Sequence, residues 1–231
     1  MQTVQAINSN TPSSLPALSA GGGRLTVATV APCASHRDAS GTRAVQDEGV
    51  SLSPAFTIGC EAGADVAARD RLLDHAMGSR WRKKSSEKLR RGRLPAEGLA
   101  FVARDDAGTV LGTVRLWEVT AGEGGPVVLL LGPLAVDPAM KSAGIGSALM
   151  RHAIAEAARL GHGAILLVGD APYYARFGFS AEKTAGLAMP GPFEPHRFLA
   201  LELREGTLNG AAGVLCASGR KTKTARIARA A

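Results

Sequence analysis

A turn of small residues, placed between an apolar run and a helical pattern, carries the first chemical signal in this sequence. Val127–Leu131 is continuously aliphatic, Gly132-Pro133 interrupts the run, and Leu134–Val136 resumes it. Residues 141–146 (KSAGIG) then lead directly into an amphipathic pattern that reaches residue 160. The free amides and the dipole at a helix N-terminus bind anions, and glycine lets a phosphate approach the backbone. The stretch therefore predicts a phosphate site, and the alternative is a strand–helix turn that binds nothing.

The spacing of the glycines excludes two common nucleotide-binding loops. A Walker A loop ends in Gly-Lys-Ser/Thr, which does not occur here. A dinucleotide-binding fingerprint needs three spaced glycines, and only Gly144 and Gly146 fall in the turn. A phosphate-bearing ligand would therefore belong to another class.

A tyrosine downstream is the second residue that could do chemistry. Tyr174 lies in the run from residue 171 to 179 (APYYARFGF), four residues before Gly178. A phenol is protonated at neutral pH, so it can act as a general acid. The alternative role is structural, with the ring packing a short helix against a sheet.

Together the two segments resemble the GNAT-type N-acetyltransferases. In that family a Gln/Arg-x-x-Gly-x-Gly/Ala loop holds the pyrophosphate of acetyl-CoA. Here Lys141 stands where Gln or Arg is usual, and Gly144 and Gly146 follow at the family's spacing. The family's second motif is an aromatic-Tyr pair, three residues and Gly-Phe, which matches Tyr173 to Phe179. The run from residue 167 to 179 (LVGDAPYYARFGF) also resembles a bacterial branch of predicted acetyltransferases whose acceptors are unassigned.

The resemblance implies an α/β (α+β) fold of the acyl-CoA N-acyltransferase type over about residues 54–205. This fold has a mixed central sheet of about six to seven strands flanked by helices, and its central parallel strands splay apart. Acetyl-CoA is the implied co-substrate, and no metal is implied. Its implied contacts are Leu134, Ala135, Val136, Lys141, Ser142, Ala143, Gly144, Ile145, Gly146 and Ser147.

The implied reaction is direct attack of a neutral primary amine on the thioester within a ternary complex. Backbone amides of the central strand would polarise the carbonyl, and Tyr174 would protonate the departing thiolate. The general base stays open, because Val127–Leu134 contains no carboxylate. Glu118 and Glu123 are the nearest candidates by sequence, although surface charge is the favoured interpretation of both, and a water chain is the other option.

The apolar patterns predict the elements that hold these residues. Strands are predicted at 56–58, 99–103, 109–119, 127–136 and 164–168, from 178, and at 197–203; helices are predicted at 64–77, 145–160 and 173–177. Asp65 is the expected N-cap of the first helix. Strict alternation along 109–119 places Val110 and Gly112 on the same face of the sheet. The stripe expected on the long helix is Ile145, Ala148, Leu149, Ala153, Ala157 and Leu160.

Composition bounds the class of protein. The chain has 231 residues, of which 45% are hydrophobic and 20% charged, an ordinary globular mixture. No apolar run approaches the ~20 residues needed to cross a bilayer, so no membrane association is expected. The three cysteines are far apart with no CxxC pair, which indicates neither a zinc site nor a disulfide framework. A cytoplasmic location is therefore the expectation.

The positive charge is concentrated near the C-terminus. The formal net charge is +7, yet residues 54–205 hold 19 basic and 17 acidic residues, a net charge of only +2. We therefore expect a disordered extension at 1–53, the N-acetyltransferase domain at 54–205 and a basic flexible tail at 206–231.

A second basic stretch lies inside the predicted domain. Residues 80–93 hold eight basic side chains, with Glu87 as their one acidic residue. One interpretation is a wall that attracts an acidic acceptor or the phosphates of a cofactor. The favoured interpretation is the solvated face of a second helix.

Three functions compete at this stage. The first is an acetyl-CoA-dependent N-acetyltransferase that acts on a small-molecule or protein amine. The second is a non-catalytic acyl-CoA-binding or sensory domain on the same fold. The third, binding of nucleic acid by the basic stretches, lacks any recognisable motif and is not expected. A monomer and a homodimer are both compatible with the sequence.

Overall fold

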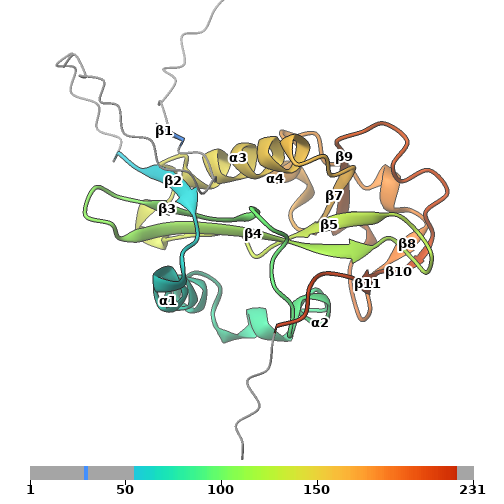
Figure 1. The fold of residues 1–231 in the computed structure, drawn as a ribbon, viewed down its shortest axis with the longest axis horizontal. Coiled ribbons are helices and arrows are strands. Elements are labelled where there is room, and N and C mark those ends of the chain that lie inside the picture. The colour runs from blue at the N-terminus through green and yellow to red at the C-terminus, as the bar shows by residue number, and fades with distance from the viewer. Residues whose placement is uncertain (1–28, 31–54, 223–231) are drawn as a thin grey trace, which may run out of the picture.

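A mixed β-sheet forms the centre of the molecule, and the computed structural model describes residues 29–30 and 55–222 (Figure 1). Seven strands of the described chain follow one another across it in the order β1-β2-β3-β4-β5-β7-β9. Two short strands, β6 and β11, also pair with β4, and β8 and β10 form a separate parallel pair. The bounds are β1 Thr29–Val30, β2 Thr57–Cys60, β3 Ala100–Arg104, β4 Val110–Thr120, β5 Val127–Leu131, β6 Ala135–Val136, β7 Ala164–Val168, β8 Leu187–Ala188, β9 Phe198–Glu202, β10 Gly213–Val214 and β11 Cys216–Ala217. The predicted mixed α/β sheet is confirmed.

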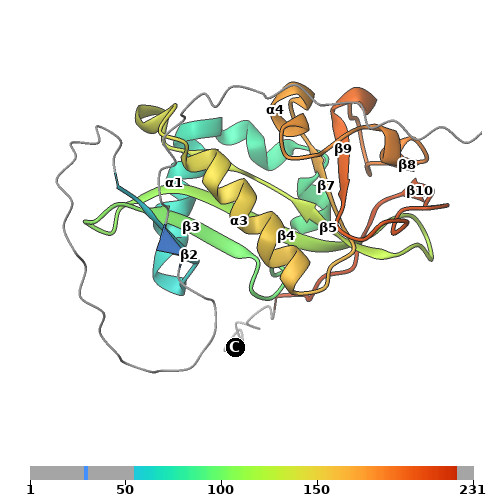
Figure 2. The same cartoon turned by 90° about the horizontal axis from the view of Figure 1, so that it is seen from above.

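Helices cover both faces of this sheet. Helices α1 (Val66–Met77) and α2 (Glu87–Arg90) lie on one face, and α3 (Ile145–Arg159) and α4 (Ala171–Ala175) lie on the other (Figure 1). Figure 2 shows α3 lying across the sheet, with α4 beside β7 and β9. Short 3-10 turns are η1 Gly63–Asp65, η2 Ser79–Lys83, η3 Pro138–Met140, η4 Glu182–Thr184 and η5 Pro195–Arg197. No helix in the described residues is long and apolar enough to cross a membrane.

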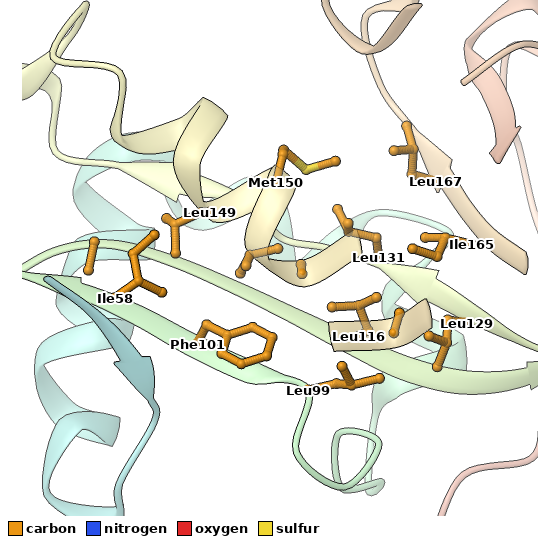
Figure 3. Packing of buried hydrophobic residues seen from close by; sticks show 14 of the residues in the cluster. Ile58, Leu99, Phe101, Leu116, Leu129, Leu131, Leu149, Met150, Ile165 and Leu167 are labelled. Atoms are coloured by element: carbon orange, nitrogen blue, oxygen red, sulfur yellow. The ribbon is translucent and has the colours of Figure 1, made fainter. Parts of the chain in front are cut away.

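The main core lies between α3 and the sheet (Figure 3). Leu149 and Met150 are fully buried there against Leu116, Leu129 and Leu131. Burial of each such side chain contributes about 1.5–3 kcal/mol. Of the predicted stripe, Ile145, Leu149, Ala153 and Ala157 are buried and Ala148 is partly buried. Leu160 was predicted wrongly: it is 41% exposed, because α3 ends at Arg159 and the chain turns away.

A β-bulge in the pairing of β3 with β4 changes the face of the sheet on which the first side chains of β4 lie. The register of β3 and β4 shifts between Ala103 and Arg104, so Ala103 pairs with Gly112 and Arg104 with Val110. The extra residue places Val110 with Leu72 of α1. The predicted alternation, which put Val110 on the same face as Gly112, was therefore wrong.

The first helix begins as predicted, but Asp65 does not cap it with its side chain. Its carboxylate instead accepts from the Ala62 amide at 2.6 Å and pairs with Arg104 of β3.

Cys60 is disulfide-bonded, which the cysteine spacing did not indicate.

The two central parallel strands diverge after a short ladder. Strands β5 and β7 pair at Leu129↔Ile165 and Leu130↔Leu166. Beyond Gly132 the chain continues as β6. This strand pairs with β4 and no longer with β7. The predicted parallel strand–helix–strand unit is thus confirmed, and an opening remains between the two carboxyl ends.

The described chain after residue 205 is packed onto the sheet rather than separate from it. Leu208 and Leu215 are buried, and β11 pairs antiparallel with β4. The predicted domain boundary at 205 is therefore too early for residues 206–222. Two leucines in a glycine-rich stretch give no period of 2 or 3.6, so the pattern could not show it.

A strand from Gly178 is also absent from the described chain, where only a single bridge, Ser180↔Ala200, forms. The predictions for residues 1–28, 31–53 and 223–231 lie outside the described residues.

Candidate active site

The turn before α3 has the backbone geometry of an anion site. Turn η3 begins at Pro138, where the Asp137 carboxylate accepts from the Ala139 amide at 2.9 Å. Ser142 and Gly144 have φ angles of 71° and 79°, and Gly144 is the N-cap of α3. Because the first amides of a helix have no partner within it, those of α3 point out of this turn. A 15-residue helix adds a favourable dipole at the same place.

A pocket of about 480 Å³ opens at this turn, and we call it the turn pocket. Its lining residues are Val136, Met140, Lys141, Ser142, Gly144, Ile145, Gly146, Ser147, Tyr173 and Arg176. Seven of the ten residues expected to contact acetyl-CoA are among them. Of the other three, Leu134 lines a second pocket, Ala135 is buried, and Ala143 lies partly buried in the turn itself.

Arg176 is a cation of the turn pocket that the sequence did not single out. Its guanidinium lies 4.1 Å from the centre of the Tyr173 ring, and its Nε donates to the Tyr173 carbonyl at 3.1 Å. With Lys141 it lines the pocket alongside the free amides of α3. The turn pocket is therefore positive from both its backbone and its side chains.

The opening between the diverging strands forms a second pocket of about 380 Å³, the splay pocket. Leu131–Leu134 line it from one strand and Leu167–Asp170 from the other. Tyr173 borders both pockets, so the two adjoin. On the side of α1 and α2 the lining consists of Met77, Trp81, Lys84, Ser86 and Arg90, with Arg197 at the start of β9.

Tyr174 lines the splay pocket and carries a free hydroxyl. Its ring packs edge-on against Tyr173 at 4.9 Å and against Phe179 at 6.0 Å. Burial raises the pKa of Tyr174 to about 12; Tyr173 and Asp170 add to the rise, and Arg197 opposes it. The hydroxyl makes no hydrogen bond to any described residue. A protonated phenol that faces a pocket without a partner can donate to a bound molecule.

Gly169 allows the Tyr174 ring to lie where it does. A Cβ on Gly169 would stand 2.2 Å from Cε2 of Tyr174. Two hydrogen bonds fix this glycine against the start of β9: its amide donates to the Arg197 carbonyl at 2.9 Å, and Arg197 Nε donates to the Gly169 carbonyl at 3.2 Å. Sequence reasoning missed this residue, although a glycine directly after a buried strand was a usable signal.

Glu118 and Glu123 do not line either pocket. Glu118 lies near His162, after the end of α3; burial lowers the pKa of that imidazole, and the charge of Glu118 opposes the shift. Glu123 is exposed in the loop before β5, at the opposite end of that strand from Gly132. Among described residues, Asp170 is the one carboxylate that lines the splay pocket.

The basic stretch is not a uniformly solvated face. Arg82, Lys88 and Arg91 are exposed, as the favoured interpretation expects, but Arg90 is only 7% exposed and lines the splay pocket. The reason is that α2 is a single turn, so Leu89 and Arg90 both pack toward the sheet.

Comparisons with known proteins agree with this geometry. Residues 96–181 match the family model for the acetyltransferase (GNAT) domain. The N-acetyltransferase YhbS of Escherichia coli strain K12 is 29% identical over 117 residues, which cover 51% of this chain and 70% of that protein.

Solved structures are also similar to this chain. The crystal structure of E. coli YhbS in complex with CoA superposes with a TM-score of 0.62 and 27% identity, covering 74% of this chain and 94% of that one. A GNAT family acetyltransferase from Brucella melitensis in complex with acetyl-CoA matches with 29% identity, 63% and 95% coverage and a TM-score of 0.47. The fold, the family model over residues 96–181 and the bacterial relatives together identify a GNAT acetyltransferase domain in this chain.

Proposed function

We propose that the protein transfers the acetyl group of acetyl-CoA to a primary amine of a small molecule or protein, by direct attack in a ternary complex. The observation that carries the proposal is the pair of adjoining pockets, one at the N-terminus of α3 and one between β5 and β7, with Tyr173 bordering both. The CoA complex of E. coli YhbS supports it. Because acetyl-CoA is a cytoplasmic metabolite, the proposed location is the cytoplasm.

The positions of the two pockets support one orientation for acetyl-CoA. The pyrophosphate would lie in the turn pocket, on the first amides of α3 and beside Lys141 and Arg176. The pantetheine would then run along Leu134–Val136 into the splay pocket. Strand β6 pairs only with β4 in the described chain, so its other edge is open to the amides of pantetheine. The thioester would end near Gly132, within the splay pocket that Tyr174 also lines.

The chemistry requires a neutral amine, a polarised carbonyl and a proton donor. The amine nitrogen attacks the thioester carbon, and backbone amides at the end of β5 and in β6 stabilise the charge on oxygen. The C–S bond then breaks, and Tyr174 donates its proton to the leaving sulfur. The proton that the amine loses passes to solvent water.

The splay pocket favours the neutral form of a bound amine. Lys84, Arg90 and Arg197 line it, against the single carboxylate of Asp170. Nearby positive charge disfavours an ammonium ion and lowers its pKa. A carboxylate base on β5 is therefore not needed to make the amine nucleophilic in this site.

Replacement of Tyr174 separates an enzyme from a sensory acyl-CoA-binding domain. For Tyr174→Phe we expect release of CoA thiol to fall by roughly 100-fold or more, because a general acid contributes 10²–10⁴. The affinity for acetyl-CoA should stay within about twofold, since the ring is retained. Thiol release unchanged from wild type would contradict the assigned role, and absence of thiol release by wild type with every amine tested would favour the sensory function.

The turn pocket is tested by an isosteric pair at Gly144. Aspartate and asparagine both tolerate a positive φ better than other side chains, and no atom lies within 4 Å of a Cβ built there. Gly144→Asp places a negative charge beside the proposed pyrophosphate, so we expect acetyl-CoA affinity to fall by at least about tenfold relative to Gly144→Asn. Isothermal titration calorimetry measures both. Equal affinities would place the pyrophosphate elsewhere.

A further inference from the structure

The splay pocket carries an excess of positive charge on the side away from the turn pocket. Lys84, Arg90 and Arg197 face it from the residue after η2, from α2 and from the end of η5, and Asp170 is the one carboxylate among its described lining residues. The cations proposed for the pyrophosphate, Lys141 and Arg176, lie in the other pocket. Arg90 and Arg197 also pair with Glu87 and Glu194, so Lys84 and the remaining donors of Arg90 are the groups available to a different anion.

Arg90 is a buried guanidinium with spare donors. Its side chain is 6% exposed and lies 5.2 Å from the centre of the Trp117 ring. Nη2 is occupied, at 3.2 Å from Ser86 Oγ and 3.1 Å from Glu87 Oε2. Nε is buried with no hydrogen-bond partner, and Nη1 has none in the described chain. A buried charged group with unmet donors is costly, so this arrangement indicates a site that an anion completes.

The spare donor lies close to Gly132. Nη1 lies 3.6 Å from the position that a Cβ on Gly132 would occupy. Gly132 follows the last residue of β5, where the thioester is proposed to lie. An anionic group held by Arg90 would therefore be only a few bonds from the amine that attacks.

Lys84 and Arg197 extend the same positive surface. Lys84 has no carboxylate partner among described residues, and burial together with the charges of Arg197 and Arg90 lowers its pKa. Arg197 is anchored by its bond to the Gly169 carbonyl, with Nη1 3.7 Å from Glu194. An incoming anion would relieve the repulsion among these three cations.

A pocket with one apolar wall adjoins this surface; Lys83, Ser85 and Glu194 are among its polar lining residues. It has a volume of about 460 Å³ and shares Lys84, Ser86, Val168 and Arg197 with the splay pocket. Met189, Pro192 and Phe193 supply its apolar wall. Phe193 is fixed edge-on against Phe198 at 5.6 Å. This pocket can take a hydrocarbon or aromatic side chain of the acceptor.

We propose that the acceptor is a free α-amino acid with an apolar side chain: its carboxylate binds Arg90 and Lys84, its amine faces the thioester at Gly132, and its side chain enters the Phe193 pocket. This inference rests on the proposed function and adds the substrate class to it. The α-nitrogen forms the new bond to the acetyl carbon, the C–S bond breaks, and Tyr174 protonates the sulfur. The products are an N-acetyl amino acid and CoA. A lysine side chain or a protein N-terminus lacks a carboxylate beside its amine, so neither would satisfy Arg90.

Pairs of acceptors that differ only in the carboxylate test directly whether the site recognises that group. Thiol release is measured with apolar L-amino acids, among them phenylalanine, leucine and methionine, and with the primary amide of each. We expect kcat/KM to be roughly 10- to 100-fold higher for the acids, the range of hydrogen bonds to charged groups. The amides have the more easily deprotonated amine, so a preference for the acids cannot arise from amine basicity. Equal or higher kcat/KM for the amides overturns the inference while leaving acetyl transfer intact.

Variants then assign the preference to named residues. Lys84→Gln and Arg90→Gln should each reduce the ratio of kcat/KM for the acid to kcat/KM for its amide by about tenfold. The affinity for acetyl-CoA should stay unchanged. Arg91→Gln, an exposed neighbour that does not line the pocket, should keep the wild-type ratio. If Arg90→Gln does not fold, the surface variant Lys84→Gln decides alone. A ratio that neither substitution changes overturns the assignment of the carboxylate to this site.

Failure of the enzyme and failure of the inference are distinguishable. If wild type releases no thiol with any amine, the proposed function fails. Calorimetry of the same acids and amides on the CoA-saturated protein then decides the inference separately, because recognition of a carboxylate requires tighter binding of the acids. Binding without preference for the acids, or no binding, overturns it.

Discussion

At the scale of single residues, the site depends on one phenol and the glycine beside it. Tyr174 is held by Tyr173 and Phe179, and Gly169 leaves the space that its ring fills. Its hydroxyl is the free donor of a buried ring whose pKa is raised to about 12. The environment thus keeps the phenol protonated over the whole range in which an amine becomes neutral.

This raised pKa predicts the shape of the pH profile. Thiol release should rise with pH as the acceptor amine deprotonates, and it should show no fall up to about pH 10, because Tyr174 stays protonated there. The measurement is kcat/KM between pH 6 and 10. A descending limb centred below pH 9 would mean that the proton donor is another group.

The same shift has a consequence for stability. A pKa raised in the folded state favours folding of the protonated form, so the contribution of Tyr174 is complete below the unfolded pKa of about 10 and is lost as pH rises toward 12. Tyr174→Phe should therefore remove part of the loss of stability between pH 10 and 12.

At the scale of elements, the contact of α3 with β4 places the turn pocket. Gly112 of β4 lies directly under the start of α3: a Cβ there would be 2.8 Å from Ile145 Cγ2 and 2.9 Å from Leu149 Cδ1. Ile145 is the first residue of α3 and also lines the turn pocket. The height of the helix above the sheet therefore sets the position of the free amides.

Substitution of Gly112 by alanine should move the start of α3 away from the sheet. We expect Gly112→Ala to lower the free energy of unfolding by about 1–3 kcal/mol through overpacking, and to weaken acetyl-CoA binding. Gly63→Ala is the matched control, because its Cβ would meet no atom within 4 Å and its φ is not positive. Thermal unfolding and calorimetry measure the two effects. Equal behaviour of both variants would show that α3 adjusts without moving its N-terminus.

At the scale of the whole molecule, the described chain after residue 205 belongs to the core. Leu215 is 1% exposed and packs with Val119, Val128 and Leu130 on the face opposite α3. On this face Leu72 of α1 packs against Val102 and Val110. The part formed by Val119, Val128 and Leu130 is covered by Leu89 of α2 and by the returning chain, so residues 206–222 take the place of a helix there.

Leu215→Ala should therefore destabilise the fold. We expect a loss of about 2–5 kcal/mol, as for other buried leucines replaced by alanine. Val214→Ala, at the 48% exposed neighbouring position, should change stability by no more than about 0.5 kcal/mol. Urea unfolding compares the two. Similar midpoints would argue that this segment adds little to the core.

The elements that depend on contiguous residues could be predicted from the sequence. The aliphatic run at Val127–Leu131, the turn at Gly144 and the helix after it are encoded in contiguous residues, and each forms where expected. Arg90, Arg176 and Gly169 matter through neighbours that are distant in sequence, such as Gly132 and Arg197. No periodicity shows such contacts. The bulge at Ala103 likewise depends on the pairing of two strands rather than on either one.

The path of the chain after Val214 has a consequence for synthesis on the ribosome. Thr222 donates its amide to the Gly92 carbonyl at 2.9 Å, and Leu94 donates to the Arg220 carbonyl at 2.8 Å, across about 130 positions of sequence. The stretch that follows Arg90 is thus tied down by residues that are translated last among those described. Contacts of such separation form slowly. On the ribosome, the segment that follows Arg90 can therefore form these bonds only after residues 220–222 have been synthesised.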